Sequence, residues 1–362
     1  MGFASQNNSP TCKISKSSFG REVYYEITSA CDLACRHCCG VFKNEKLYVN
    51  PDNLIAFNQV LIENGLERVI LTGGEPTLHP QFIYLLENIA SKIETLVTTN
   101  GVKWGASEWC EKLKRFPLLR IQVSLDGATE KVCDFIRERG VWQKVISLLQ
   151  NLSNQNLGHR VGISMTVTQF NSHEVDKILK IARVYNLSNV HFPQLLPVGK
   201  ALDNWEKTSL PIKDQIRLEE HLLSKHNEQS ISQNRLQRVA LAAISGTSDC
   251  LRSITLKVDP KGNILPCPVA SGENYSLGNI GNSVSQNSDI LLSKLFEVKK
   301  NNINKLNISS SHSIDQKDFS YRTCEDCVIL GELPDRISQY GLDIFNHHLQ
   351  FAHLAMESEK YG

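Results

Sequence analysis

The sequence has almost no net charge and no long apolar run, and these absences exclude several classes of protein. Lys and Arg together number 39, and Asp and Glu number 38, which gives a formal charge of +1. This balance provides no general attraction to nucleic acid or to an anionic membrane surface. No segment approaches the roughly 20 apolar residues that span a bilayer. We therefore expect neither nucleic acid nor a membrane among the partners.

The beginning of the chain also lacks the hydrophobic core of a signal peptide. Residues 1–19 are mostly polar, so we expect a cytoplasmic protein. Thiols stay reduced in the cytoplasm. The 11 cysteines are therefore better explained by metal or cluster ligation than by disulfides.

Three of those cysteines lie within eight residues of one another. Cys31, Cys35 and Cys38 are separated by three and then two residues. Thiolates are the usual ligands of iron–sulfur clusters, and a four-iron cluster takes four of them. A set of three would leave one iron open to a group that does not come from the protein. A zinc loop is the alternative, since a short loop that supplies three sulfurs also occurs in zinc sites.

Over the first 200 residues, β-rich runs alternate with runs of helical periodicity. Strands are expected at 22–28, 68–72, 95–99, 120–125, 161–168 and 189–195, and helices at 51–65, 81–92, 106–115, 130–153 and 173–185, the fourth with a possible break at Gly140. Six strands that alternate with helices predict an α/β fold, a partial (β/α)6 TIM-like barrel. The functional site of such a fold is built from loops at the carboxyl ends of the strands.

This alternation stops near residue 200, which suggests a second module. We expect an N-terminal extension at 1–20, the barrel at 21–200, bridging helices at 201–249, a small α+β domain at 250–334 and a helical tail at 335–362. The small domain should contain a hairpin with its turn at 259–263.

Several motifs follow the predicted strands. Gly73 and Gly74 would let a ligand lie against the backbone, and Glu75 could accept hydrogen bonds from an ammonium group. Ser124 and Asp126, after the fourth strand, could hydrogen-bond ribose hydroxyls, although turn and helix-capping chemistry explains each of them equally well. Further along, Arg137 could pair with a carboxylate or be solvated, and Asn171 could line a polar cavity or cap a helix.

Taken together, these residues resemble the radical S-adenosylmethionine (SAM) superfamily. The resemblance covers about residues 20–200 and is carried by the cysteine spacing, by the motifs at 73–76 and 124–127, and by Arg137. One departure is His37, at a position where the family usually has an aromatic residue; its planar ring is expected to be tolerated.

The resemblance implies a role for each of these residues. The open iron of a 4Fe-4S cluster on Cys31, Cys35 and Cys38 would chelate SAM. Gly73, Gly74 and Glu75 would hold its amino group, Ser124 and Asp126 its ribose, and Arg137 its carboxylate. Reductive cleavage of SAM would give a 5′-deoxyadenosyl radical that abstracts a substrate hydrogen. The electron would come from an external donor such as flavodoxin or ferredoxin.

Four cysteines in the last third of the chain form a second group: Cys250, Cys267, Cys324 and Cys327. A structural zinc site would suit four cysteines beside a β-hairpin. The hairpin between the first two and the segment at 276–280 resemble the SPASM and twitch extensions of radical SAM enzymes. Because no cysteine follows Cys327, the shorter twitch type is expected, with one auxiliary 4Fe-4S cluster. Such a cluster would accept an electron or shape the pocket.

Cys133 lies at the start of the helix after the fourth strand. It could donate a hydrogen atom to a substrate radical, as a cysteine does in epimerases of this superfamily. The alternative is a small apolar side chain in the core.

Three functions remain open at this point. The first is modification of a ribosomally made peptide by cross-linking, epimerisation or oxidation, which the polar segment at 300–317 and the added C-terminal length slightly favour. The second is a small-molecule dehydrogenase or epimerase acting on an aminocyclitol or sugar. The third is a non-catalytic metal-binding interaction protein.

Overall fold

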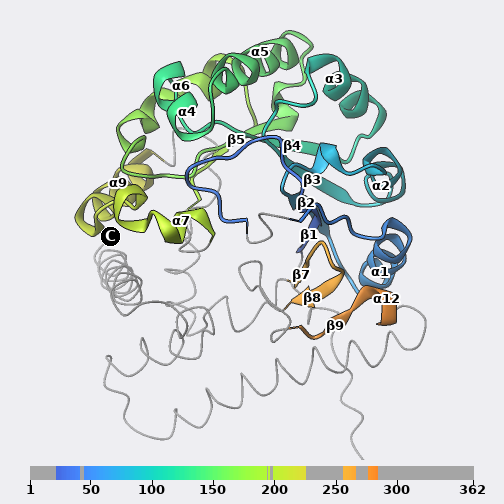
Figure 1. Cartoon of the computed structure of the whole chain (residues 1–362). Coiled ribbons are helices and arrows are strands. Elements are labelled where there is room, and N and C mark those ends of the chain that lie inside the picture. The colour runs from blue at the N-terminus through green and yellow to red at the C-terminus, as the bar shows by residue number, and fades with distance from the viewer. Residues whose placement is uncertain are drawn as a thin grey trace, which may run out of the picture.

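A computed structural model describes residues 22–40, 45–193, 195, 199–225, 256–265 and 276–283. Six parallel strands are neighbours in chain order, as expected of a partial barrel. They are β1 (Glu22–Thr28), β2 (Arg68–Gly73), β3 (Glu94–Thr99), β4 (Leu119–Ser124), β5 (Val161–Ser164) and β6 (Asn189–His191). Helices cover the convex side of this curved sheet (Figure 1). The predicted α/β barrel is therefore confirmed.

The helices between the strands follow the sequence pattern closely. They are α1 (Pro51–Glu63), α2 (Phe82–Ile89), α3 (Ala106–Arg115), α4 (Glu130–Ile136), α5 (Val141–Asn154) and α6 (Val175–Val184). Three 3-10 turns accompany them: η1 (Pro76–Leu78), η2 (Gly158–Arg160) and η3 (Ser172–Glu174). The predicted break at Gly140 is confirmed, because this glycine adopts φ +83° between α4 and α5, a conformation that most residues avoid.

Alternating burial along the strands separates two faces of the sheet. Val23, Tyr25 and Ile27 of β1 are buried in the core, and the Tyr25 hydroxyl donates a 3.1 Å hydrogen bond to Asn58 of α1. Side chains in a strand alternate between faces, so Tyr24 and Glu26 point to the concave side. The row of Glu26 continues on that face with Thr72, Thr98, Gln122 and Asn189, whereas the row of Tyr24 continues with Ile70 and Leu96. The concave face therefore carries a polar row next to a more apolar one, and the convex face is apolar.

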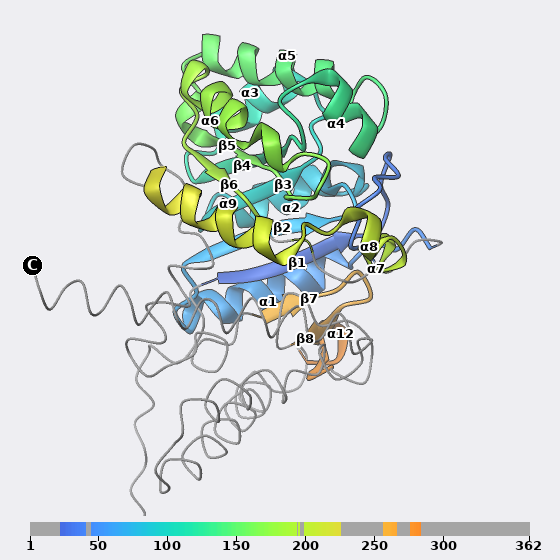
Figure 2. The same cartoon turned by 90° about the vertical axis from the view of Figure 1, so that its left-hand side faces the viewer.

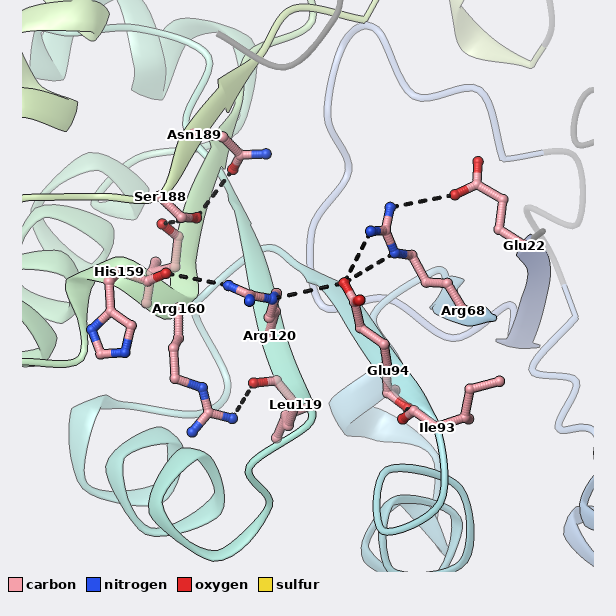
Figure 3. Close-up of polar contacts among 12 residues, drawn as sticks. Glu22, Arg68, Ile93, Glu94, Leu119, Arg120, His159, Arg160, Ser188 and Asn189 are labelled. Atoms are coloured by element: carbon pink, nitrogen blue, oxygen red, sulfur yellow. Dashed lines mark hydrogen bonds and ion pairs between the residues drawn. The ribbon is translucent and has the colours of Figure 1, made fainter. Parts of the chain in front are cut away.

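Charged side chains link the amino-terminal ends of the strands (Figure 3). Arg68 of β2 lies 3.7 Å from Glu22 and 3.0 Å from Glu94, and Arg120 lies 3.7 Å from Glu94. Arg160 donates to the carbonyls of Leu113, Phe116 and Leu119 at the junction of α3 and β4. This end of the barrel is thus tied together by side chains with structural partners.

Two strand ends differ from the sequence prediction. β5 stops at Ser164 and β6 at His191, whereas strands were expected to reach residues 168 and 195. Those two end predictions are wrong. At the end of β5, the backbone N–H of Thr166 donates to the Asp126 carboxylate at 2.8 Å, so the pairing with β4 ends there. On the other side, backbone hydrogen bonds from Met165 to His191 at 2.9 Å and from Val167 to Pro193 at 3.4 Å continue beyond the strand.

The strand β7 (Leu256–Val258) joins the free edge of β1 in parallel, so that Tyr24 is paired with Lys257. β8 (Asn263–Leu265) and β9 (Gly278–Asn279) continue the sheet antiparallel, and α12 (Ile280–Ser283) follows. Figure 2 shows this group beside β1 and α1. The predicted hairpin is confirmed, with the Asp259 carboxylate accepting hydrogen bonds from the backbone of Lys261 and Asn263.

Three helices follow β6: α7 (Lys200–Asp203), α8 (Trp205–Thr208) and α9 (Ile212–Lys225). The rest of the predicted bridging region, the segment at 300–317 and the predicted tail lie outside the described residues. No helix among the described residues is long and apolar enough to cross a membrane.

Candidate functional site

The three-cysteine loop begins at the carboxyl end of β1 and returns to it. The backbone N–H of Ser29 donates to the carbonyl of Leu47 at 3.1 Å, and that of Val49 donates to Ile27 at 2.9 Å. These bonds close the base of the loop. In Figure 1 the loop extends from β1 across the barrel towards α4 and α7.

The far side of this loop is attached to the end of α4 and to α7. The backbone N–H of Arg36 donates to Ile136 at 2.9 Å, and its side chain donates to Phe135 at 2.7 Å. The Glu138 carboxylate accepts the N–H of Ala34 at 2.6 Å, and Lys200 donates to the Ala34 carbonyl at 3.2 Å. Because both ends of the loop are fixed, the cysteines are held over the carboxyl ends of the strands.

None of the loop cysteines forms a disulfide with another described residue. Among the described residues, no three His, Cys, Asp or Glu side chains are grouped tightly enough to hold a single metal ion. An iron–sulfur cluster does not require its ligands to converge on one metal ion, because each thiolate binds a different iron. Burial raises the pKa of the Cys35 thiol to about 11, while the charge of Arg137 lowers it. Cys35 therefore lies in a site where a cation or a metal is needed to stabilise the thiolate.

Gly73 and Gly74 lie directly against the base of the cysteine loop. The N–H of Gly74 donates to Thr28 and that of Glu75 to Ala30, both at 2.7 Å. A Cβ atom would stand 2.2 Å from the Thr28 carbonyl oxygen at Gly73, and 2.2 Å from that of Ala30 at Gly74. The two glycines are therefore needed for the close approach of two backbones. Room for a ligand at these two glycines stays a prediction from the sequence.

Glu75 is fully buried beneath this contact. Its Oε1 atom accepts from the hydroxyls of Thr77 at 2.7 Å and Thr99 at 2.8 Å, and from the Thr77 N–H at 3.2 Å. Its Oε2 atom accepts from the N–H of Asn100 at 2.7 Å. Burial raises the pKa of Glu75, whereas these donors lower it. An ammonium group of a ligand would thus meet a carboxylate that is already oriented, at the less occupied Oε2 atom.

The two polar side chains at the end of β4, Ser124 and Asp126, differ in burial and in their polar contacts. Ser124 is half-buried, and its hydroxyl has no hydrogen bond to any described residue. Asp126 is fully buried and lies 2.6 Å from Arg137 Nε and 3.1 Å from His37 Nε2. Burial raises the pKa of Asp126, but Arg137 and His37 overcome this effect and hold it at about 2. Ser124 is available to a ribose, whereas the Asp126 carboxylate is occupied by protein groups.

Cys133 is fully buried in the hydrophobic core, where burial raises its pKa to about 12. This position favours the packing alternative over a hydrogen donor, which must reach the substrate. Asn171 is also fully buried, and its amide bonds only to the segments around Asp126 and Thr168. The four cysteines predicted to hold an auxiliary cluster, Cys250, Cys267, Cys324 and Cys327, lie outside the described residues.

Sequence reasoning missed several supporting residues. Asn100 donates to Asp32 of the cysteine loop at 2.7 Å, which links the end of β3 to that loop. Glu174 accepts hydrogen bonds from the N–H groups of Ala128 and Thr129 and so caps the start of α4 from a distance. Neither contact leaves a local sequence signal, because the partners are 68 and at least 45 residues apart.

Comparison with known proteins agrees with this geometry. The sequence profile of the radical SAM superfamily matches residues 25–182, which include the cysteine loop and the motifs after β2 and β4. Residues 25–182, which form most of the barrel, belong to the radical SAM superfamily.

Individual relatives have low sequence identity to this chain. Mycofactocin maturase MftC of Mycobacterium tuberculosis is 29% identical over 266 residues, which are 71% of this chain and 66% of the relative. The GTP 3′,8-cyclase of Clostridium perfringens is 27% identical over 58% of this chain and 67% of the relative. Streptococcus suis SuiB, solved with the precursor peptide SuiA, has the same fold, with a TM-score of 0.62 at 16% identity over 77% of this chain and 67% of that chain.

The residues of the site fit the cofactors of the superfamily. Three cysteines outside disulfides are held in one loop. Nδ1 of His37 is buried without a hydrogen-bond partner among the described residues. Buried polar atoms are costly to leave unpaired. A bound group at this place would supply the missing partner.

Proposed function

We propose that this protein is a radical SAM enzyme that modifies a ribosomally synthesised peptide. The observation that carries the catalytic part is the attachment of the loop of Cys31, Cys35 and Cys38 over the carboxyl ends of the strands. Glu75 and Ser124 lie at the same end of the sheet. When bound, a 4Fe-4S cluster and SAM would supply an adenosyl radical that removes a hydrogen atom from the substrate.

The protein's own residues bind and orient in this proposal. The three thiolates hold the cluster and leave one iron for SAM. Glu75 receives the SAM amino group at Oε2, and its other donors keep the carboxylate from turning. Ser124 offers its hydroxyl to the ribose. The cysteine loop covers the carboxyl ends of the strands, which limits access of water to the site.

The peptide substrate is supported by the relatives. MftC bears the name of a maturase, and SuiB was solved with a precursor peptide. The match to MftC covers more of this chain than the match to the GTP cyclase. The polar row of Glu26, Thr72, Thr98 and Gln122 on the concave face would suit a peptide backbone, whose N–H and C=O groups need partners when buried.

The small-molecule enzyme remains the second candidate, because the GTP 3′,8-cyclase, whose name gives a nucleotide substrate, matches 58% of this chain. We further propose an auxiliary 4Fe-4S cluster on the four C-terminal cysteines. Two of these cysteines lie close in sequence to the β7–β8 hairpin. Cys250 lies six positions before Leu256 of β7, and Cys267 lies two positions after Leu265 of β8.

A labelled substrate distinguishes the candidates. The sequence of the peptide would come from a short precursor gene next to the gene for this enzyme. The peptide is made with deuterated side chains and incubated with the enzyme, SAM and reductant. Deuterium in 5′-deoxyadenosine, together with a mass change of the peptide, is the expected result. Cleavage of SAM without deuterium transfer, at a rate that the peptide does not alter, would contradict the peptide substrate.

Iron content tests the auxiliary cluster separately. Two four-iron clusters predict about eight irons per chain. A Cys324→Ala, Cys327→Ala variant should retain about four. Four irons in the unaltered protein, together with one zinc, would contradict the auxiliary cluster and leave the first one in place.

A further inference from the structure

Three buried side chains from separate elements meet beneath the cysteine loop. His37 comes from that loop, Asp126 follows β4 and Arg137 ends α4; their exposed fractions are 8%, 0% and 8%. Asp126 Oδ2 lies 3.1 Å from His37 Nε2 and 2.6 Å from Arg137 Nε. One carboxylate oxygen therefore contacts both a cation and the imidazole that stands between two predicted cluster ligands.

The rest of Asp126 is fixed as well. Its Oδ1 atom accepts the N–H of Thr166 at 2.8 Å, and its carbonyl accepts the side-chain amide of Asn171 at 3.0 Å. A carboxylate held by three groups cannot turn towards a ribose without leaving a buried cation unpaired, which is strongly unfavourable. Asp126 is therefore better suited to orient its neighbours than to bind a ligand.

Arg137 is brought to the cysteine loop by the backbone as well as by Asp126. The backbone N–H of Arg36, next to Cys35, donates to the carbonyl of Ile136, next to Arg137, at 2.9 Å. The Nε atom of Arg137 lies 2.6 Å from Asp126 Oδ2, and the Arg137 side chain is 9% exposed. This largely buried guanidinium therefore lies beside the loop segment of Cys35, where its charge acts on an anionic neighbour.

We propose that His37 and Asp126 are positioning residues that hold the Arg137 guanidinium beside Cys35, where it provides positive charge to the first cluster. This inference rests on the proposed assignment of the cluster to Cys31, Cys35 and Cys38. Surrounding groups that do not ligate a metal still tune it through hydrogen bonds and charge.

The unit also gives a reason for histidine at position 37. An aromatic hydrocarbon ring would fill the same space but could not contact the Asp126 carboxylate. His37 would then be the part of the cysteine loop through which β4 and α4 set its position.

The midpoint potential of the first cluster tests the charge arrangement, in the Cys324→Ala, Cys327→Ala background so that one cluster is observed. Asp126→Asn leaves the Arg137 cation uncompensated and should move the potential to more positive values. Arg137→Gln leaves the anion uncompensated and should move it to more negative values. Shifts of opposite sign are expected because nearby charge favours the oppositely charged redox state.

Apo-protein melting tests the role of His37. His37→Phe should lower the melting temperature, and His37→Asn, which keeps a donor, should restore part of the loss. Glu174→Gln is the matched control: it removes a buried carboxylate that supports α4 from its other end, so it should lower the melting temperature and leave the potential unchanged.

The outcomes separate the two levels of the proposal. Absence of iron in the background protein would refute the cluster assignment itself. A normal cluster whose potential is the same in Asp126→Asn and Arg137→Gln would refute the charge role alone. A His37→Phe protein with the melting temperature of the background protein would refute the positioning role of His37.

Discussion

Replacing Gly74 by alanine tests how the cysteine loop is seated. The added Cβ would lie 2.2 Å from the Ala30 carbonyl oxygen and 2.7 Å from that of Ser29. Both are backbone atoms at the base of the loop, so no side chain can move aside. The overlap costs about 1–3 kcal/mol, and loss of the hydrogen bond from Glu75 to Ala30 adds about 1 kcal/mol. We expect Gly74→Ala to lower the free energy of unfolding by about 2–4 kcal/mol.

Urea denaturation of the apo protein measures this change, and iron content after reconstitution measures its effect on the adjoining Cys31. Both should fall. Gly105→Ala is the control, because a Cβ there would meet only a side-chain oxygen of Glu108 at 3.4 Å; we expect a loss below about 1 kcal/mol. Unchanged stability of Gly74→Ala, combined with weaker SAM binding, would refute the backbone role and support the ligand role predicted from sequence.

Three further changes test other parts of the structure. Glu174→Gln should lower the free energy of unfolding by about 1–3 kcal/mol at pH 7. The donors at the start of α4 hold the pKa of Glu174 below its ordinary value, so this contribution is full above about pH 4.3 and is lost as the pH falls through the lower folded pKa. The difference in urea midpoint between the wild type and the variant should therefore shrink at pH 3. Cys133→Ala should lower stability by about 1 kcal/mol and retain substrate turnover; normal stability with lost turnover would restore the hydrogen-donor hypothesis. Arg160→Lys, which loses contacts to three carbonyls, should lower the melting temperature without changing iron content, and a loss of iron would contradict its structural assignment.

Local patterns predicted the barrel because each of its parts carries its own signal. Strand alternation, the cap and proline at the start of α1, and Gly140 between α4 and α5 act within a few residues. The side chain of Asn50 accepts the N–H of Asn53 at 3.0 Å, as a helix cap should. These features need no partner from elsewhere in the chain.

Contacts between distant segments could not be predicted from local sequence patterns. The early end of β5 depends on the side chain of Asp126, which is 40 residues from Thr166. The joining of β7 to β1 depends on residues that are more than 200 positions apart. Within the site, the cysteine spacing and Glu75 were found from sequence, but the partners of Asp126 and the role of Gly74 required the three-dimensional arrangement.

The central claim is that Cys31, Cys35 and Cys38 hold the cluster that cleaves SAM. Its most direct test is the formation of 5′-deoxyadenosine by anaerobically reconstituted protein with dithionite and SAM, compared with a Cys35→Ala variant. The account predicts 5′-deoxyadenosine from the unaltered protein and none from the variant. Formation of 5′-deoxyadenosine by Cys35→Ala at the unaltered rate would contradict it.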